Sequence, residues 1–128
     1  MKLLLDTCTF LWVAQESPRL SNTAAALFLD RSNERYLSAA SAWEIGIKYT
    51  TGRLRVPERP DIYIPKVRDE SSIAALEIDE ESALHASRLP MFHNDPFDRM
   101  LIAQAIIHGM AILTPDPLIH QYAARVLW

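Results

Sequence analysis

Four acidic residues stand in settings that favour a functional site over a solvated surface. Asp6 and Asp116 each follow a short apolar run, and Glu44 and Asp98 lie within apolar stretches that are typical of helices. Parallel strands of an α/β sheet end at the same edge, so side chains carried to that edge are expected to converge. Carboxylates gathered without matching lysines or arginines repel one another, and a hard divalent cation such as Mg²⁺ relieves that repulsion. The residues themselves therefore predict a divalent metal site.

Each of these acids also has a simpler explanation. Asp6 and Asp116 could cap the helices expected after them, and Asp98 could favour the positive end of a helix dipole. Asp98 nevertheless shares the spacing i, i+3, i+4 and i+7 with Leu101, Ile102 and Ala105, which places it on the face expected to pack inward. Capping alone does not account for four acids in such similar settings.

Glu44 lies inside a stretch that is apolar around most of the expected helix, which predicts a buried helix. A buried glutamate needs a partner. Lys48, one turn further on, offers an ion pair in the favoured order. An exposed pair of that kind stabilises a helix by only ~0.3–0.5 kcal/mol, which is too little to justify an acid in this setting. A metal ion is therefore the favoured partner of Glu44, and Lys48 is the alternative.

The elements expected to position these acids alternate between strands and helices. The Asp95-Pro96 pair is a strong helix start, and Gly109 is expected to end that helix. The alternation predicts a parallel sheet covered by helices on both faces, in one domain that spans residues 1–128. The expected strands are 2–5, 36–38, 73–78, 110–113 and 125–128, and the expected helices are 7–15, 22–30, 39–50, 61–70, 80–88, 96–108 and 117–124.

The composition indicates a cytoplasmic protein without disulfides or membrane-spanning segments. Cys8 is the only cysteine, so no internal disulfide forms, which fits a reducing cytoplasm. No apolar run is long enough to span a bilayer, and the N-terminus lacks the pattern of a signal peptide, so we expect a cytoplasmic protein with no membrane partner. The net charge of −3 argues mildly against a nucleic-acid binder but is compatible with a nuclease, because local basic groups hold phosphates. With three glycines, the chain has no glycine-rich phosphate loop.

Four sequence blocks follow one another in the order found in a known family. They are Leu5-Asp6-Thr7, Ser41-Ala42-Trp43-Glu44-Ile45, His93-Asn94-Asp95-Pro96-Phe97-Asp98-Arg99 and Leu113-Thr114-Pro115-Asp116. This ordered set resembles PIN-domain proteins, and in particular the VapC-like toxins (endoribonucleases) of type II toxin–antitoxin modules. The blocks span nearly the whole chain, and the third is the most specific of them.

The resemblance implies an α/β fold, a three-layer α/β/α sandwich with a central, mostly parallel sheet. It also implies a Mg²⁺- or Mn²⁺-dependent endoribonuclease that hydrolyses RNA, with a cognate antitoxin as partner and a homodimer as the assembly. The family's catalytic and metal-binding acids correspond to Asp6, Glu44, Asp98 and Asp116. Candidate substrate contacts are Thr7, Thr114, Arg53, Arg99 and His93. Whether one or two metal ions bind stays open.

Two other functions are compatible with the same residues. One is a non-catalytic PIN-like domain for protein interaction, whose acids only cap helices. The other is a phosphotransfer domain with an acidic Mg²⁺ site, in which Lys48 would assist a phosphoryl-accepting aspartate. RNA cleavage that depends on a divalent metal separates the three hypotheses.

Overall fold

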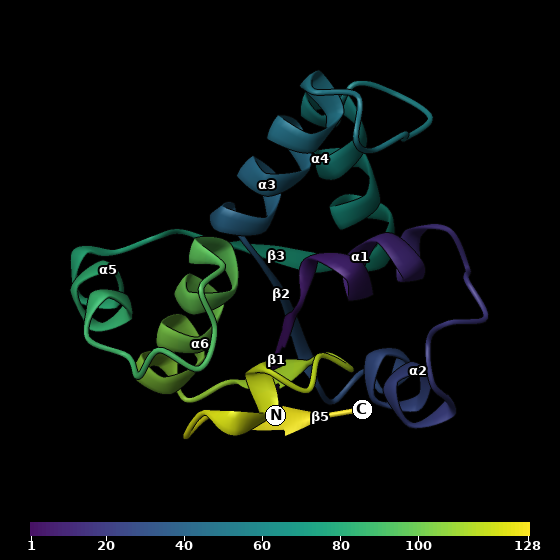
Figure 1. Ribbon diagram of the computed structural model, residues 1–128. Helices are drawn as coiled ribbons and strands as arrows, with labels where there is room; N and C mark the ends of the chain where they lie inside the picture. The colour runs from purple at the N-terminus through teal and green to yellow at the C-terminus, as the bar shows by residue number, and fades with distance from the viewer.

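The computed structural model describes residues 1–128 and is built around a five-stranded sheet (Figure 1). All four strand pairs are parallel, in the order β3-β2-β1-β4-β5. The strands are β1 (Lys2–Leu5), β2 (Glu34–Ser38), β3 (Ile73–Leu76), β4 (Ala111–Leu113) and β5 (Arg125–Leu127). The helices are α1 (Thr7–Ala14), α2 (Asn22–Leu29), α3 (Ala39–Thr50), α4 (Pro60–Ser71), α5 (Glu80–Ser87) and α6 (Pro96–His108), with a 3₁₀ turn, η1 (Ile119–Gln121).

Helices cover both faces of the sheet (Figure 1). Successive side chains of a strand point to opposite faces, so Leu4 packs with α5 and α6 whereas Leu5 packs with α1 to α4. Ile112 and Leu113 of β4 divide in the same way. Burial on both faces explains why β1 and β4 are continuous apolar runs without alternating polar residues. The predicted three-layer α/β/α architecture is confirmed.

Helix α6 begins and ends at the residues expected from the sequence. Asp95 caps it by accepting hydrogen bonds from the backbone N–H groups of Phe97 (2.8 Å) and Asp98 (3.1 Å), and Pro96 takes the first helical position. Gly109 ends the helix in the left-handed conformation, with φ at 65°. These two signals fix where Asp98 lies relative to the sheet edge.

The prediction of a helix over residues 117–124 is wrong, because only the 3₁₀ turn η1 forms there. Tyr122 follows it in an extended conformation (φ −91°, ψ 162°), and buried Ile119 and Tyr122 anchor the segment to the α6 side of the sheet. Packing of these two side chains overrides the local helix-start signal of Asp116-Pro117.

Pro65 is accommodated inside α4, which runs unbroken from Pro60 to Ser71. No helix combines the length and the apolar character needed to cross a membrane.

Candidate metal centre

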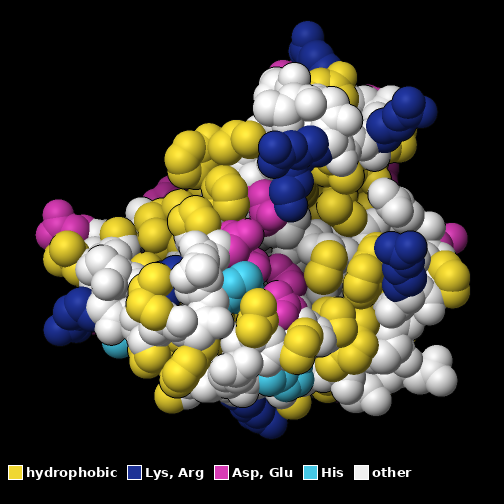
Figure 2. All heavy atoms as spheres, in the orientation of Figure 1, with side chains coloured by type: hydrophobic (Ala, Val, Ile, Leu, Met, Phe, Trp, Pro, Cys, Tyr) yellow, Lys and Arg dark blue, Asp and Glu magenta, His cyan; other side chains and the backbone are white.

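Acidic side chains and a histidine gather in a hollow at the centre of one face of the molecule, bordered by hydrophobic side chains (Figure 2). Asp6 reaches this region from the end of β1 and Asp116 from the segment after β4. Glu44 comes from α3, and Asp98 comes from the first turn of α6. The two strand ends and two helices thus deliver acids to one edge of the sheet, as a parallel sheet does.

The tightest group of possible metal ligands consists of His93, Asp98 and Asp116, each of which offers a ligand atom within 4.8 Å of the others. His93 Nε2 lies 2.7 Å from Asp98 Oδ2 and 3.5 Å from Asp116 Oδ2. The two carboxylates supply oxygen ligands that Mg²⁺ and Mn²⁺ prefer, and the His93 imidazole lies within hydrogen-bond distance of Asp98. The sequence suggested His93 only as a substrate contact. Because His93 lies in the same sequence block as Asp98, the sequence already indicated that the two residues could share a site.

Asp6 is buried at the end of β1, and both of its carboxylate oxygens are engaged. Oδ1 accepts a 2.8 Å hydrogen bond from the backbone N–H of Thr7, and Oδ2 accepts one of 2.6 Å from the Thr114 hydroxyl. Asp6 therefore caps α1 as well as facing the other acids. Burial raises its pKa despite the hydrogen bonds from Thr114 and Thr7, and the charge of Glu44 raises it further.

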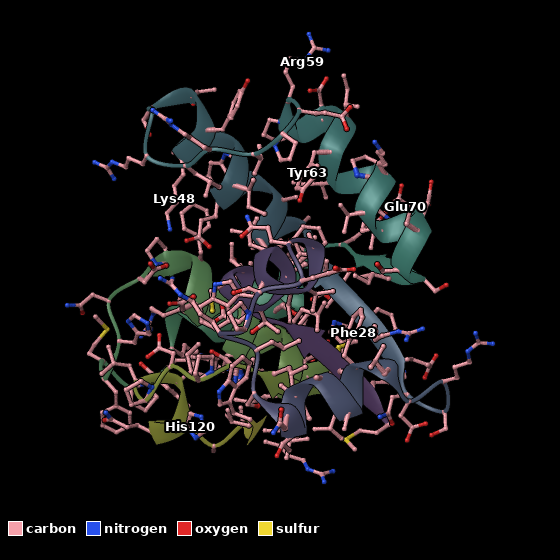
Figure 3. All side chains as sticks on the ribbon, turned by 90° about the vertical axis from the view of Figure 1, so that its right-hand side faces the viewer. Phe28, Lys48, Arg59, Tyr63, Glu70 and His120 are labelled. Carbon is pink, nitrogen blue, oxygen red and sulfur yellow. The ribbon has the colours of Figure 1, made fainter.

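Glu44 is buried and also has a partner for each oxygen. Oε1 accepts a 2.6 Å hydrogen bond from the Thr7 hydroxyl, and Oε2 lies 2.6 Å from Lys48 Nζ. The Lys48 ion pair that the sequence offered as an alternative is therefore present. Lys48 is 44% exposed and lies on the side of α3 turned toward α6 (Figure 3). The hydrogen bond to Glu44, with the charges of Asp95 and Asp98, raises the pKa of Lys48.

Burial and the charges of neighbouring acids act together on Asp98. Its side chain is 14% exposed, and its pKa is raised to about 7 by burial and then by the charges of Asp6 and Asp95. Glu44 raises the pKa further, while His93 opposes the shift. A bound divalent cation would relieve this repulsion, so the donor set fits the Mg²⁺ or Mn²⁺ that the family resemblance implies.

Two threonine hydroxyls connect the acids to one another. Thr7 links Asp6 to Glu44, because its backbone N–H binds the first acid and its hydroxyl binds the second. Thr114 donates its hydroxyl to Asp6 and accepts a 3.1 Å hydrogen bond from the backbone N–H of Asp116. These hydroxyls orient the carboxylates within the site.

The two candidate arginines lie elsewhere. Arg99 is buried and donates to backbone carbonyls of the segment before α6, so it is not placed as the expected substrate contact. Arg53 is exposed in the turn after α3, and its side chain makes no hydrogen bond or ion pair with the four acids. Helix α3 also differs from the buried helix expected from its sequence. Trp43 is 65% exposed and packs edge-on against Phe97, with 5.5 Å between ring centroids.

Comparison with known proteins identifies the family of the chain. The family model described as "PIN domain" matches residues 3–125. The ribonuclease VapC16 of Mycobacterium tuberculosis is 38% identical over 72 residues, a match that covers 53% of this chain and about half (51%) of that relative.

Two solved structures show the same fold. VapBC2 from Rickettsia felis, bound to a promoter DNA fragment, superposes with a TM-score of 0.72 and 12% identity, covering 99% of this chain and 98% of that one. DNA-bound VapBC from Salmonella typhimurium superposes with a TM-score of 0.68 and 18% identity, covering 99% of this chain and 97% of that one. The resemblance seen in the ordered motifs is thereby confirmed, and the chain belongs to the PIN domain family.

Proposed function

We propose that this chain is a divalent-metal-dependent endoribonuclease and the toxin of a toxin–antitoxin pair, with residues 1–128 as its single catalytic domain. The observation that carries the proposal is the convergence of His93, Asp98 and Asp116 within 4.8 Å. Asp6 and Glu44 lie close enough to raise the pKa of Asp98. The similarity to a ribonuclease named VapC16 supports RNA as the substrate.

Each part of the site has a role in this proposal. Asp6, Glu44, Asp98 and Asp116 would hold Mg²⁺ or Mn²⁺, which when bound would lower the pKa of a water molecule and neutralise charge on the phosphate. The hydroxyls of Thr7 and Thr114 keep the carboxylates oriented. Lys48, half exposed beside Glu44, supplies positive charge for an RNA phosphate in a chain with a net charge of −3.

The proposed partner is an antitoxin that covers this site. Two further solved structures with this fold are described as a toxin–antitoxin complex and as a member of the VapBC family of toxin–antitoxin systems. An antitoxin segment with an arginine or lysine would pair with the carboxylates, and its apolar residues would cover exposed side chains such as Trp43. A homodimer in the cytoplasm is part of the same proposal.

Growth of a host that lacks the antitoxin tests the toxin function. Wild type is induced beside Asp6→Asn, with Asp69→Asn as control because Asp69 is exposed on α4 and makes no side-chain bond. We expect wild type and the control to stop growth and Asp6→Asn to permit it. Equal growth of all three strains, with the proteins soluble and expressed at the same level, would overturn the toxin function.

RNA cleavage by the purified proteins tests the enzymatic part. Wild type and Asp69→Asn should cut RNA in Mg²⁺ or Mn²⁺ and lose that activity in EDTA, whereas Asp6→Asn should be inactive under all three conditions. Cleavage that continues in EDTA, or that survives Asp6→Asn, would contradict a metal site built on these acids.

A further inference from the structure

The loop over residues 88–95, between α5 and α6, is bound by the buried side chain of Arg99. Arg99 is 8% exposed, and its guanidinium points into the turn of backbone that precedes α6. It donates hydrogen bonds to the carbonyls of Pro90 (2.9 Å), His93 (3.3 Å), Ala86 (2.8 Å) and Leu89 (2.9 Å). A planar guanidinium with five N–H donors can gather several carbonyls in a fixed arrangement, which a lysine cannot do.

Tyr122, which lies near the C-terminus, binds the same loop. Its hydroxyl accepts a 2.8 Å hydrogen bond from the backbone N–H of His93 and donates one of 2.6 Å to the Pro90 carbonyl. The same hydroxyl lies 3.5 Å from Arg99 Nη1. Arg99 and Tyr122 therefore bind both the N–H and the C=O of His93, and they fix the backbone of that residue.

Hydrogen bonds also orient the imidazole ring of His93. The backbone N–H of Asp95 donates to His93 Nδ1 over 3.4 Å, an arrangement in which the neutral ring carries its proton on Nε2. Nε2 faces Asp98 at 2.7 Å and Asp116 at 3.5 Å. An N–H at that position donates to Asp98 and lies close to Asp116, and these two carboxylates would otherwise repel each other.

We propose that Arg99 and Tyr122 form a clamp that positions His93, and that His93 in turn keeps Asp98 and Asp116 arranged for a divalent ion. The inference rests on the proposed function for the identity of the ion. Arg99 and Tyr122 make no side-chain bond to any of the four acids and act through His93 alone. Groups that hold metal-ligating carboxylates from behind commonly alter metal affinity by about 10- to 100-fold when they are removed.

Mn²⁺ binding, measured by isothermal titration at one fixed pH, tests the clamp. Tyr122→Phe removes only the hydroxyl, and Tyr36→Phe is the matched control, since the Tyr36 hydroxyl contacts exposed Glu34 on the sheet. We expect His93→Leu to weaken Mn²⁺ binding by about tenfold and Tyr122→Phe to weaken it several-fold, as for other supporting groups of metal ligands. Tyr36→Phe should leave the affinity unchanged, and His93→Gln, which retains a donor, should recover part of the loss.

The decisive comparison is Tyr122→Phe in the His93→Leu background. If Tyr122 acts through His93, the second substitution changes Mn²⁺ affinity no further. The same absence of a further effect is expected for Arg99→Lys, provided that circular dichroism shows it folded. Equal weakening by Tyr122→Phe in both backgrounds would mean that the hydroxyl acts on the fold in general, and would overturn the clamp.

A second readout in metal-free protein separates the clamp from the proposed function. The Nε2–H signal of His93, assigned in ¹⁵N-labelled protein by its loss in His93→Leu, should persist in Tyr36→Phe and broaden or vanish in Tyr122→Phe. If wild type binds no Mn²⁺, the proposed metal function fails while this pattern still supports the positioning of His93. An unchanged His93 signal in Tyr122→Phe would overturn the clamp whatever the metal result.

Discussion

The hydroxyl of Thr7 donates a 2.6 Å hydrogen bond to Oε1 of Glu44, so the residue that follows the first acid fixes the orientation of the second. The same hydroxyl lies 2.9 Å from the Ser41 hydroxyl, one turn before Glu44 on α3. All three groups are buried, which makes the arrangement costly to disturb.

Thr7→Val should therefore destabilise the metal-free protein. The substitution keeps the shape of the side chain but removes the donor to a buried carboxylate, which costs about 1.5–3 kcal/mol for a hydrogen bond to a charged group. Urea denaturation in EDTA measures the free energy of unfolding. Thr7→Ser retains the hydroxyl and serves as control. If the two variants are equally stable, the Ser41 hydroxyl has taken over the role of Thr7.

Lys48→Met should tighten Mn²⁺ binding while lowering the stability of the metal-free protein. The ammonium group shares Glu44 with any bound cation and repels that cation, yet it also neutralises a buried carboxylate. Titration with Mn²⁺ and thermal melts in EDTA check the two effects separately. Lys66→Met is the control, since Lys66 pairs with Glu58 on the surface. Weaker Mn²⁺ binding in Lys48→Met would show that the lysine helps to build the site.

Asp98→Asn should weaken Mn²⁺ binding strongly, because it removes one of the two carboxylates that lie together beside His93. The neutral side chain also ends the repulsion that Asp98 experiences from Asp6 and Asp95. The metal-free variant should consequently be as stable as wild type or more so. Titration calorimetry measures the Mn²⁺ affinity, and thermal melts in EDTA measure the stability of the metal-free protein. Asp69→Asn is the control in both experiments. Unchanged Mn²⁺ affinity would remove Asp98 from the site.

Metal-free protein should lose stability as the pH rises from about 4 toward 7. The pKa of Asp98 is raised from its ordinary 3.8 to about 7, so between these values the folded state binds more protons than the unfolded state. Stability falls with rising pH under that condition. Burial causes most of this shift, the charges of Asp6, Asp95 and Glu44 add to it, and His93 opposes it. The effect of Asp98 is therefore measured as the difference in pH dependence between wild type and Asp98→Asn. Urea midpoints at several pH values in EDTA give that difference, and identical slopes would contradict the raised pKa.

Gln104→Leu should destabilise the protein with or without metal. Gln104 is fully buried in α6, where its Oε1 accepts a 2.6 Å hydrogen bond from Ser38 and its Nε2 donates one of 3.0 Å to the Glu77 carbonyl. The substitution leaves the buried Ser38 hydroxyl without its acceptor, at a cost of about 1–3 kcal/mol. Ser38 also caps α3, so the start of the Glu44 helix is affected. Urea denaturation in Mg²⁺ and in EDTA should show the same loss.

Local sequence patterns were sufficient for most of the fold. Apolar runs without alternation predicted strands covered on both faces, and β1 and β4 are buried as expected. The Asp95-Pro96 start and the Gly109 end bounded α6 correctly, because caps act within a few residues. The sequence also singled out the four acids, since strand ends and helix starts of a parallel sheet meet at one edge.

Side-chain partners, in contrast, were decided by the tertiary structure. Thr114 binds Asp6 across 108 residues of chain, and the Arg99 guanidinium turns away from the acids beside it to bind the loop that carries His93. Tyr122 holds that loop instead of continuing a helix, and Trp43 stays exposed in a helix whose sequence suggested burial. Capping and periodicity depend on neighbours along the chain, so they are written in the sequence. Which polar groups meet depends on where the packed layers bring segments together, and only the folded chain determines that.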